Sequence, residues 1–396
     1  MKQTKLIALF LALVLMLGIA ACGQKSEPAK QDAPAATAAP APAATKAPEA
    51  PKTETPAPAA EPTSEPAPAP YTVTDTQGNT VTLEKVPERV IVINRYNTEL
   101  LRACGHMDKI VGVDSSIVEN NTYWPEFTAE YNIGGNGQQA TGNDYEVMAA
   151  MEPDIVLTRG ISDELGNAMK ALGVPVLHLD GANKDLIPQL DVIDAVFGQT
   201  EQSKLFRETY SELKAKLEQV GASIPEAERK SFVWESVKDY MVSGEKNVFA
   251  QMVERTGTFN ALADTAFDMN EVDAEAVLTA NPDVYFKMVT PAAVDTAGYT
   301  PPTDEDFRNT AEPFYARPGF DQINAVKNGE CYLISSFGVG GFGKLVGSAY
   351  VFSWLYPEIA KEAGIDPDEI QRQWLEDFQN KPFQSGYFAN MKDYVG

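Results

Sequence analysis

One residue pattern occurs twice in this chain, once on each side of a long helical segment. The first copy runs from Asp144 to Leu157 as DYEVMAAMEPDIVL, and the second from Asp273 to Phe286 as DAEAVLTANPDVYF. Both read Asp-x-Glu, six further residues, Pro-Asp and an apolar run short enough to be a buried strand. A helix-then-strand unit repeated at this separation predicts two similar α/β halves.

The longest helical pattern between the two copies is Thr200–Val220. Its apolar residues follow one another at intervals of 4, 3, 4 and 3 positions, which places them on one stripe of a helix. The stripe consists of Phe206, Tyr210, Leu213, Leu217 and Val220. Gly198 and Thr200 mark the start of the helix, and Gly221 marks its end. A helix of about 20 residues is roughly 30 Å long, so we expect one stiff helix to join the halves.

Residues 1–21 are predicted to be an export signal that takes no part in the fold. Lys2 and Lys5 precede an apolar run, Leu6–Ala21, which ends in small residues directly before Cys22. This order is typical of a secretory signal. It also resembles a bacterial lipobox, which implies cleavage before Cys22 and lipidation of that cysteine. The alternative is a transmembrane anchor, but the run is shorter than the ~20 residues of a spanning helix. We therefore expect an exported protein that is lipid-anchored to the cell membrane.

Residues 22–70 are predicted to be a disordered tether. From Gly23 to Pro70 the chain has no aromatic residue and no Ile, Leu, Val or Met. Such a segment cannot bury enough apolar surface to offset the entropy of ordering. Its prolines favour extended polyproline II, so the folded part is expected to be held at a distance from the membrane.

Charge and cysteine content restrict the partners further. The formal net charge of -24 argues against nucleic acid or an anionic lipid surface as a partner. Beyond Cys22, the cysteines are Cys104 and Cys331, one in each half. Two buried free thiols are favoured, and a disulfide between them stays open.

Strand and helix patterns alternate through both halves. This alternation predicts an N-terminal lobe at 71–198, an interlobe helix at 199–221 and a C-terminal lobe at 222–396. The expected fold class is α/β, with two Rossmann-like lobes joined by a single long rigid helix. A ligand cleft is expected between the lobes, at the carboxyl ends of the strands.

Eight stretches, spread over 71 to about 347, follow one another in an order that is informative as a set. They are Arg89–Ile93, Asn97–Gly105, Ile110–Asp114, Glu146–Asp154, Leu172–Val176, Ser243–Gly257, Glu275–Asp283 and Ala325–Gly329. Together they resemble one family, the ABC-transporter substrate-binding proteins for iron-siderophores and cobalamin. The resemblance implies a monomeric binding protein, not an enzyme. It would capture a metal chelate outside the membrane and deliver it to a permease that works with a cytoplasmic ATPase. No cofactor is implied, because the chelate is the transported ligand. A ferric siderophore is the first candidate for that chelate, and a corrinoid is the second.

Two glutamates match the positions with which this family docks onto arginines of the permease. They are Glu146 and Glu275, which occupy the same place in the internal repeat. A glutamate in the first turn of a helix also complements the helix dipole. We favour docking, because dipole stabilisation alone does not require the same spacing in both halves.

Cationic and aromatic residues near predicted strand ends are the candidate ligand contacts. Guanidinium groups match anionic oxygens, and aromatic rings cover a flat organic shell. The candidates are Arg95, Tyr96, Tyr123, Trp124, Arg159, Trp234, Lys287, Arg317 and Phe337. Each candidate also has an alternative interpretation without a ligand: the cations as solvated surface side chains, and the aromatic residues as part of the core.

Other kinds of site find less support. His106 and His178 are isolated, whereas a free-metal receptor needs several histidines with a carboxylate. The run Gly338–Lys344 lacks the order of a phosphate loop and is expected to line the cleft with its backbone. No metal site is predicted. A receptor for a free metal ion, haem or another small solute stays open, and an anchored hydrolase or redox enzyme would need a nucleophile and base in reach.

Overall fold

The computed structural model describes residues 69–137, 141–183, 185–244, 247, 249–262, 268–289 and 298–395. They fall within one compact unit, Glu65–Gly396. The predicted signal at 1–21, Cys22 and almost all of the predicted tether lie outside the described residues. Among the helices that the structure does describe, none is both long and apolar enough to cross a membrane.

The N-terminal lobe begins with a hairpin and continues as a parallel sheet. The antiparallel hairpin consists of β1 (Tyr71–Thr74) and β2 (Thr80–Leu83). The parallel sheet has the order β4-β3-β7-β8. Its strands are β3 (Val90–Ile93), β4 (Ile110–Val113), β7 (Ile155–Thr158) and β8 (Val176–His178). Every residue of β3 and β7 is buried, as expected for central strands with both faces covered.

Short helices connect these strands. They are α1 (Arg95–Ala103), α2 (Ser115–Glu119), α3 (Tyr145–Ala150), α4 (Asp163–Leu172) and α5 (Ile187–Phe197). The long loop after β4 contains the 3-10 helix η2 (Ala129–Tyr131) and the short strands β5 (Gly134–Asn136) and β6 (Thr141–Asn143), and η1 (Met107–Lys109) precedes β4. The arrangement is the predicted strand-helix alternation.

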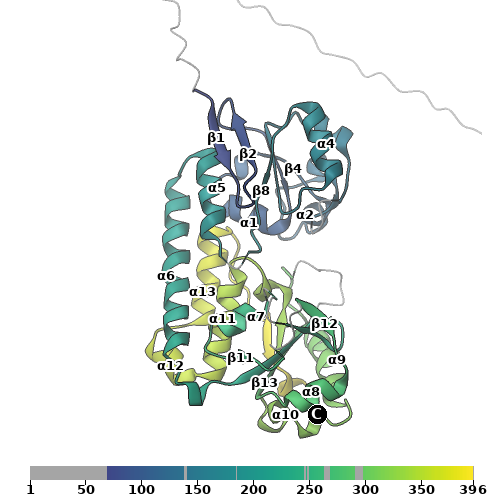
Figure 1. Cartoon of the computed structure of the whole chain (residues 1–396), viewed down its shortest axis with the longest axis vertical. Coiled ribbons are helices and arrows are strands. Elements are labelled where there is room, and N and C mark those ends of the chain that lie inside the picture. Colours follow the sequence, from purple (N-terminus) through teal and green to yellow (C-terminus); the bar gives the residue numbers. More distant parts are fainter. Residues whose placement is uncertain are drawn as a thin grey trace, which may run out of the picture. The chain divides into compact units, whose positions relative to one another are not determined.

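The helix α6 (Glu201–Ser223) follows the N-terminal lobe, close to the predicted bounds (Figure 1). It begins with a capping box in which the Ser203 N–H donates to the Thr200 hydroxyl and the Thr200 N–H donates to the Ser203 hydroxyl. Gly221 does not end the helix, contrary to the prediction. A Cβ on Gly221 would lie 2.0 Å from the Arg255 carbonyl oxygen, so this glycine is needed for close backbone approach.

The C-terminal lobe contains a mixed sheet with the order β12-β10-β9-β13-β14-β15, and β11 pairs with β9. The strands are β9 (Ser231–Glu235), β10 (Met241–Ser243), β11 (Phe259–Asn260), β12 (Met269–Glu271), β13 (Val284–Val289), β14 (Cys331–Ser335) and β15 (Phe388–Asn390). The pairs β9–β13 and β13–β14 are parallel, and β10, β12 and β15 run antiparallel to their neighbours. The two α/β lobes confirm the predicted fold class.

Helices surround this second sheet and also return along α6. The first group is α7 (Ala250–Glu254), α8 (Ala274–Ala280), α9 (Asp304–Tyr315) and α10 (Asn324–Asn328), with the 3-10 helices η3 (Glu226–Glu228), η4 (Phe320–Gln322), η5 (Ser336–Val339) and η7 (Met391–Tyr394). The second group is α11 (Gly343–Leu355), α12 (Pro357–Glu362), α13 (Pro367–Gln373) and the π-helix η6 (Trp374–Phe378). Figure 1 shows α11 and α13 beside α6. The rings of Phe342, Trp374 and Phe378 pack against Phe206 of α6.

The sequence repeat is also a structural repeat. Asp144 caps α3 and Asp273 caps α8, each through its side chain. The Pro-Asp aspartates then fix the next strand: Asp154 accepts the Arg89 N–H at 2.9 Å, and Asp283 accepts the Ser231 N–H at 3.0 Å. In both lobes this strand lies beside the first parallel strand, β7 on β3 and β13 on β9.

Candidate functional site

The carboxyl ends of the N-terminal strands meet in one polar network. Asn94 follows β3 with a φ of 94°, and its N–H donates to the Asp114 carboxylate at 2.8 Å. The Asn94 side-chain oxygen accepts a hydrogen bond from the Tyr96 N–H at 3.0 Å, and this contact caps the start of α1. These contacts fix Tyr96 and Arg95 at the edge of the sheet where clefts of open α/β folds lie.

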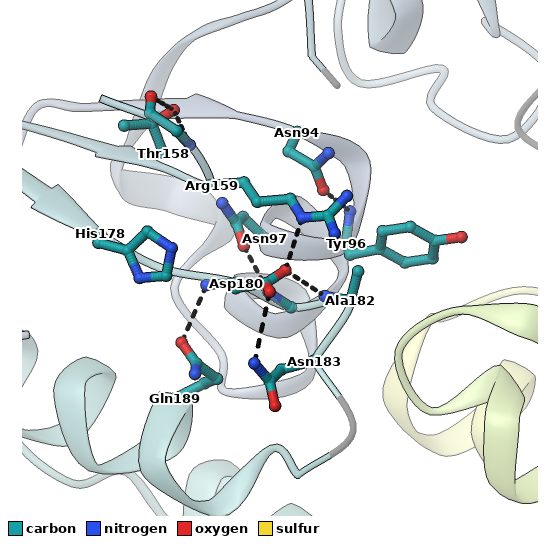
Figure 2. A network of polar contacts seen from close by, with 12 residues as sticks. Asn94, Tyr96, Asn97, Thr158, Arg159, His178, Asp180, Ala182, Asn183 and Gln189 are labelled. Carbon is teal, nitrogen blue, oxygen red and sulfur yellow. Dashed lines mark hydrogen bonds and ion pairs between the residues drawn. The ribbon is translucent and has the colours of Figure 1, made fainter. Parts of the chain in front are cut away.

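Arg159 projects from the same edge, after β7. Its Nε lies 3.0 Å from the Asp180 carboxylate, which follows β8. Figure 2 shows the Arg159 side chain running over Asp180 toward Tyr96. Asp180 is held by the Ala182 N–H at 3.2 Å and by the Asn183 side chain at 3.4 Å. The Arg159 side chain keeps 34% of its surface exposed, so it is positioned by protein contacts and still reaches solvent.

Arg95 and Tyr96 form a compact pair beside Arg159. Arg95 Nη2 donates to the Tyr96 hydroxyl at 2.5 Å, and the Arg95 guanidinium carbon lies 4.3 Å from the centre of the Tyr96 ring. It also lies 5.5 Å from the ring centre of Tyr299, a residue of the C-terminal lobe. The pair therefore stands where the two lobes meet.

The glycine-rich loop after β14 closes on this edge from the other lobe. A Cβ on Gly340 would lie 2.1 Å from the Tyr96 ring, so only glycine fits there. Beyond the loop, Lys344 Nζ donates to the Ala182 carbonyl at 2.6 Å. Burial lowers the pKa of Lys344 to about 7, although nearby Asp180 opposes the shift. These contacts place the loop against the edge that carries Tyr96, and its role in lining a ligand cleft stays a prediction.

A second contact between the lobes centres on Glu99 of α1, which the sequence analysis did not single out. The Tyr299 hydroxyl donates to its carboxylate at 2.5 Å, and the Tyr299 ring stacks on Tyr123 with centroids 3.7 Å apart. Gln379 donates to the Glu99 carbonyl at 3.1 Å. Burial raises the pKa of Glu99 to about 7, against the opposing effects of Arg95 and the Tyr299 hydrogen bond. Sequence offered no signal, because the partners lie 200 and 280 positions away.

The remaining predicted ligand contacts lie apart from the Arg95–Tyr96–Arg159 edge or are enclosed. Trp124 and Trp234 are fully buried: the Arg102 guanidinium covers the first at 4.0 Å, and Phe249 packs on the second at 5.3 Å. Phe337 stacks on Tyr387 at 4.3 Å. In this conformation the two indole rings present no surface to a ligand, whereas Tyr123 is part of the contact between the lobes.

Lys287 and Arg317 are held in an ion cluster of the C-terminal lobe. Lys287 lies 2.6 Å from the Glu235 carboxylate, and Arg317 contacts the same carboxylate through two N–H groups at 2.8 Å. Asp239 contacts both cations, at 3.0 and 2.7 Å. Burial alone would raise the pKa of Glu235, but Arg317 and Lys287 outweigh it and lower that pKa. The sequence predicts both cations as ligand contacts, and the structure adds that Glu235 and Asp239 pair with them.

The histidines and cysteines have structural neighbours. His106 packs on the Phe197 ring at 4.6 Å, and His178 Nδ1 lies 3.0 Å from the Thr76 hydroxyl. Cys104 and Cys331 are buried free thiols, the alternative favoured by the sequence. Within the described ranges, no three His, Cys, Asp or Glu side chains are grouped so that they could hold a metal ion.

The chain was compared with known protein families, with curated proteins and with solved structures. The profile of the family described as periplasmic binding protein matches residues 90–336. The chain belongs to this family. Family membership agrees with the resemblance found in the sequence, and the match covers both copies of the internal repeat.

Individual relatives support the membership. The ABC transporter substrate-binding lipoprotein YvrC of Bacillus subtilis is 25% identical over 74% of this chain and 88% of its own length. The vitamin B12-binding protein of Yersinia pestis is 26% identical over 57% of this chain and 81% of its own. The fold of a TroA-like periplasmic binding protein, FepB from Veillonella parvula, matches with a TM-score of 0.65, at 18% identity, over 81% of this chain and 99% of that chain.

In this periplasmic binding protein, the two predicted docking glutamates are accessible. Glu146 and Glu275 are both exposed in the first turns of α3 and α8. Glu275 also lines a surface hollow of about 460 Å³, together with Asp273 and Thr279. Each glutamate lies two residues after the aspartate that caps its helix, so the two occupy equivalent positions in the repeat.

Proposed function

We propose that this protein is the lipid-anchored receptor of an ABC importer, and that it captures a metal chelate between its lobes. The observation that carries the proposal is the edge formed by Arg95, Tyr96 and Arg159, which faces the backbone of the glycine-rich loop. Guanidinium forks pair with anionic oxygens, and tyrosine rings cover a flat organic shell. A chelate bound there would separate the contacts that now join the lobes.

A ferric siderophore fits this edge best, since its anionic oxygens match two arginine side chains. A corrinoid is the second candidate, and it is favoured by relatives whose names state a ligand, the vitamin B12-binding protein among them. The amide-rich rim of a corrinoid would hydrogen-bond to the same donors, and its phosphate would pair with one guanidinium.

Intrinsic tryptophan fluorescence of the soluble fragment 71–396 tests the proposal. Trp124 lies 5.8 Å from Tyr299 at the contact between the lobes, so a bound chelate should quench it. The titration uses ferric catecholates, ferric hydroxamates, haem and cobalamin. We expect saturable quenching by one class and about tenfold weaker binding in Arg159→Ala.

Arg372→Ala is the matched control, because Arg372 lies on α13 and pairs with Glu376 of its own segment. Its affinity should equal that of the unchanged chain. If no chelate quenches the fluorescence, or if both arginine variants bind alike, the proposed cleft function is wrong.

Docking onto the permease is proposed through Glu146 and Glu275. Charge reversal of either residue should leave chelate affinity unchanged and reduce uptake by cells or stimulation of the transporter's ATPase. Glu305→Arg is the control, because Glu305 is likewise exposed in the first turn of a helix, α9. Uptake that survives reversal of both glutamates, or that is lost equally in the control, would contradict specific docking.

The lipid anchor is proposed at Cys22. Radiolabelled palmitate should label the full chain and not the Cys22→Ser variant, which should be released from the membrane fraction. Label retained by that variant would place the lipid elsewhere.

A further inference from the structure

A small hollow lies where the C-terminal segment after α13 meets the N-terminal lobe and the Tyr299 segment. Its volume is about 130 Å³. The side chains that matter for its chemistry are Asn120, Tyr123, Tyr299, Lys381, Gln384 and Tyr387. They come from three regions far apart in the sequence, so the hollow exists only in the assembled molecule.

Aromatic groups make one wall of the hollow. Tyr123 and Tyr299 are stacked with an interplanar angle of 9°, and the Tyr387 hydroxyl donates to the Tyr299 carbonyl at 2.7 Å. All three residues are buried. Because they hold one another in place, the wall is preformed, and a ligand would lose little free energy in ordering it.

A partly buried cation, Lys381, stands on the other side. Lys381 Nζ lies 5.3 Å from the centre of the Tyr123 ring and 3.8 Å from a Glu126 carboxylate oxygen, which is longer than a hydrogen bond. The Lys381 side chain is only 14% exposed. Burial lowers the pKa of Lys381 and Arg102 adds to the shift, whereas Glu126 opposes it. An ammonium group in this position gains from an anionic oxygen at hydrogen-bonding distance.

Size and chemistry together define the occupant. A cavity of about 150 Å³ holds a benzene molecule, so this hollow accommodates roughly one six-membered ring. Tyrosine side chains line it, and a cation and two side-chain amides border it. The Glu126 carboxylate is already an ion-pair partner of the ammonium group at 3.8 Å, and an anionic oxygen on the ring would pair with it at hydrogen-bonding distance, as a purely apolar ring would not.

We infer that this hollow is a second binding site, for a single aromatic ring that carries an anionic oxygen, such as an aromatic carboxylate or a catecholate. Its wall residue Tyr299 also faces Arg95, so the hollow adjoins the proposed chelate site. The inference rests on the proposed function in one respect only: the ring is an arm of the captured chelate. A free aromatic acid has the same chemistry, and the experiment distinguishes the two.

Ligand-observed NMR and calorimetry with 2,3-dihydroxybenzoate test the inference on the fragment 71–396. Benzyl alcohol serves as the uncharged comparison ring. We expect saturable binding of the acid, and about tenfold weaker binding in Lys381→Met, which keeps the aliphatic stem and removes the charge. Lys392→Met, at a distant site on η7, should bind as the unchanged chain does.

A second variant keeps the test valid if Lys381→Met folds poorly. Thr300 is exposed at the rim of the hollow, so Thr300→Trp should be tolerated and should fill the space, abolishing binding of the acid. Absence of saturable binding, equal binding of benzyl alcohol, or unchanged binding in both variants would overturn the inference.

The two proposals fail in different ways. If the free acid binds and no ferric chelate does, the hollow stands and the proposed function fails, because the natural occupant is then a free acid. If a chelate binds with the same affinity in Lys381→Met and the free acid does not bind, the proposed function stands and the hollow is not a site. A chelate whose affinity falls in Lys381→Met supports an arm in the hollow.

Discussion

The residue that most clearly couples the two lobes is Glu99. Its carboxyl group is buried between the Tyr299 hydroxyl and the Arg95 guanidinium, and its backbone carbonyl accepts from Gln379. A buried carboxyl group is stabilised as the neutral acid unless cations outweigh desolvation. Here desolvation is the larger effect and the pKa is about 7, so this contact changes charge near neutral pH.

Stability should therefore depend on pH through Glu99. Its pKa in the folded chain, about 7, lies above the ordinary value of 4.5, so the folded state binds the proton more tightly than the unfolded state. The free energy of unfolding contributed by this group thus falls as pH rises from about 4.5 to about 7, by up to about 3 kcal/mol.

Glu99→Gln should remove that part of the slope. Urea unfolding of both chains across this pH range measures it, and Glu164→Gln, at an exposed position on α4, should change nothing. If Glu99→Gln and the unchanged chain have parallel pH profiles, the burial of this carboxyl group has no energetic consequence.

The Glu235 cluster makes a second prediction at the scale of residues. Removing Glu235 leaves Lys287 and Arg317 in a buried site with Asp239 as their remaining carboxylate partner in the cluster. Loss of one member of a buried ion cluster costs roughly 3–5 kcal/mol. Thermal and urea unfolding of Glu235→Ala should show a loss of that size.

The exposed pair Lys238–Glu271 supplies the comparison, since both of its side chains are 59% exposed. Glu271→Ala should cost less than about 1 kcal/mol. Equal losses in the two variants would show that the buried cluster contributes no more than a surface pair.

Among the elements, the repeated helix-and-strand unit was predictable because its signals are local. Asp-x-Glu marks a capped helix, and Pro-Asp marks the strand that follows. The spacing of apolar residues likewise predicted α6 to within a few residues. The helix α9 was not predicted, and it contains Pro313, a residue type that disfavours helix interiors.

The candidate site was less predictable than the elements. Arg95, Tyr96 and Arg159 could be named because they follow strand patterns directly. Glu99 and Tyr299 could not, because their pairing depends on chain segments that come together only in three dimensions. The same reason hid the partners of Lys287 and Arg317, since Glu235 and Asp239 belong to a different strand and loop.

The repeat predicts equal roles for Asp154 and Asp283. Each accepts a backbone N–H and joins a strand to its neighbour, so Asp154→Ala and Asp283→Ala should each cost about 1–3 kcal/mol of folding free energy. Urea unfolding measures both. Replacement of exposed Asp321 by Ala provides the control. A large loss in one variant and none in the other would show that the two copies are not equivalent.

At the scale of the whole molecule, the segment after Gly347 lies beyond the part of the chain that the family resemblance covers, so the resemblance implies no role for it. It packs along α6 and then reaches the N-terminal lobe, where Arg102 donates to the Gln379 carbonyl at 3.2 Å. The lobes are therefore joined by the C-terminal segment as well as by α6, which favours modest lobe movement on binding. Sequence periodicity is a local signal and cannot indicate which lobe this segment contacts.

Hydrogen–deuterium exchange with and without the chelate selected by the fluorescence titration tests the central claim, that the ligand binds between the carboxyl edges of the two lobes. We predict slower exchange of amides in 94–97, 158–160, 180–183 and 336–344, with unchanged exchange on the outer face of α6. Slower exchange confined to other segments, or none at saturating chelate, would contradict the claim.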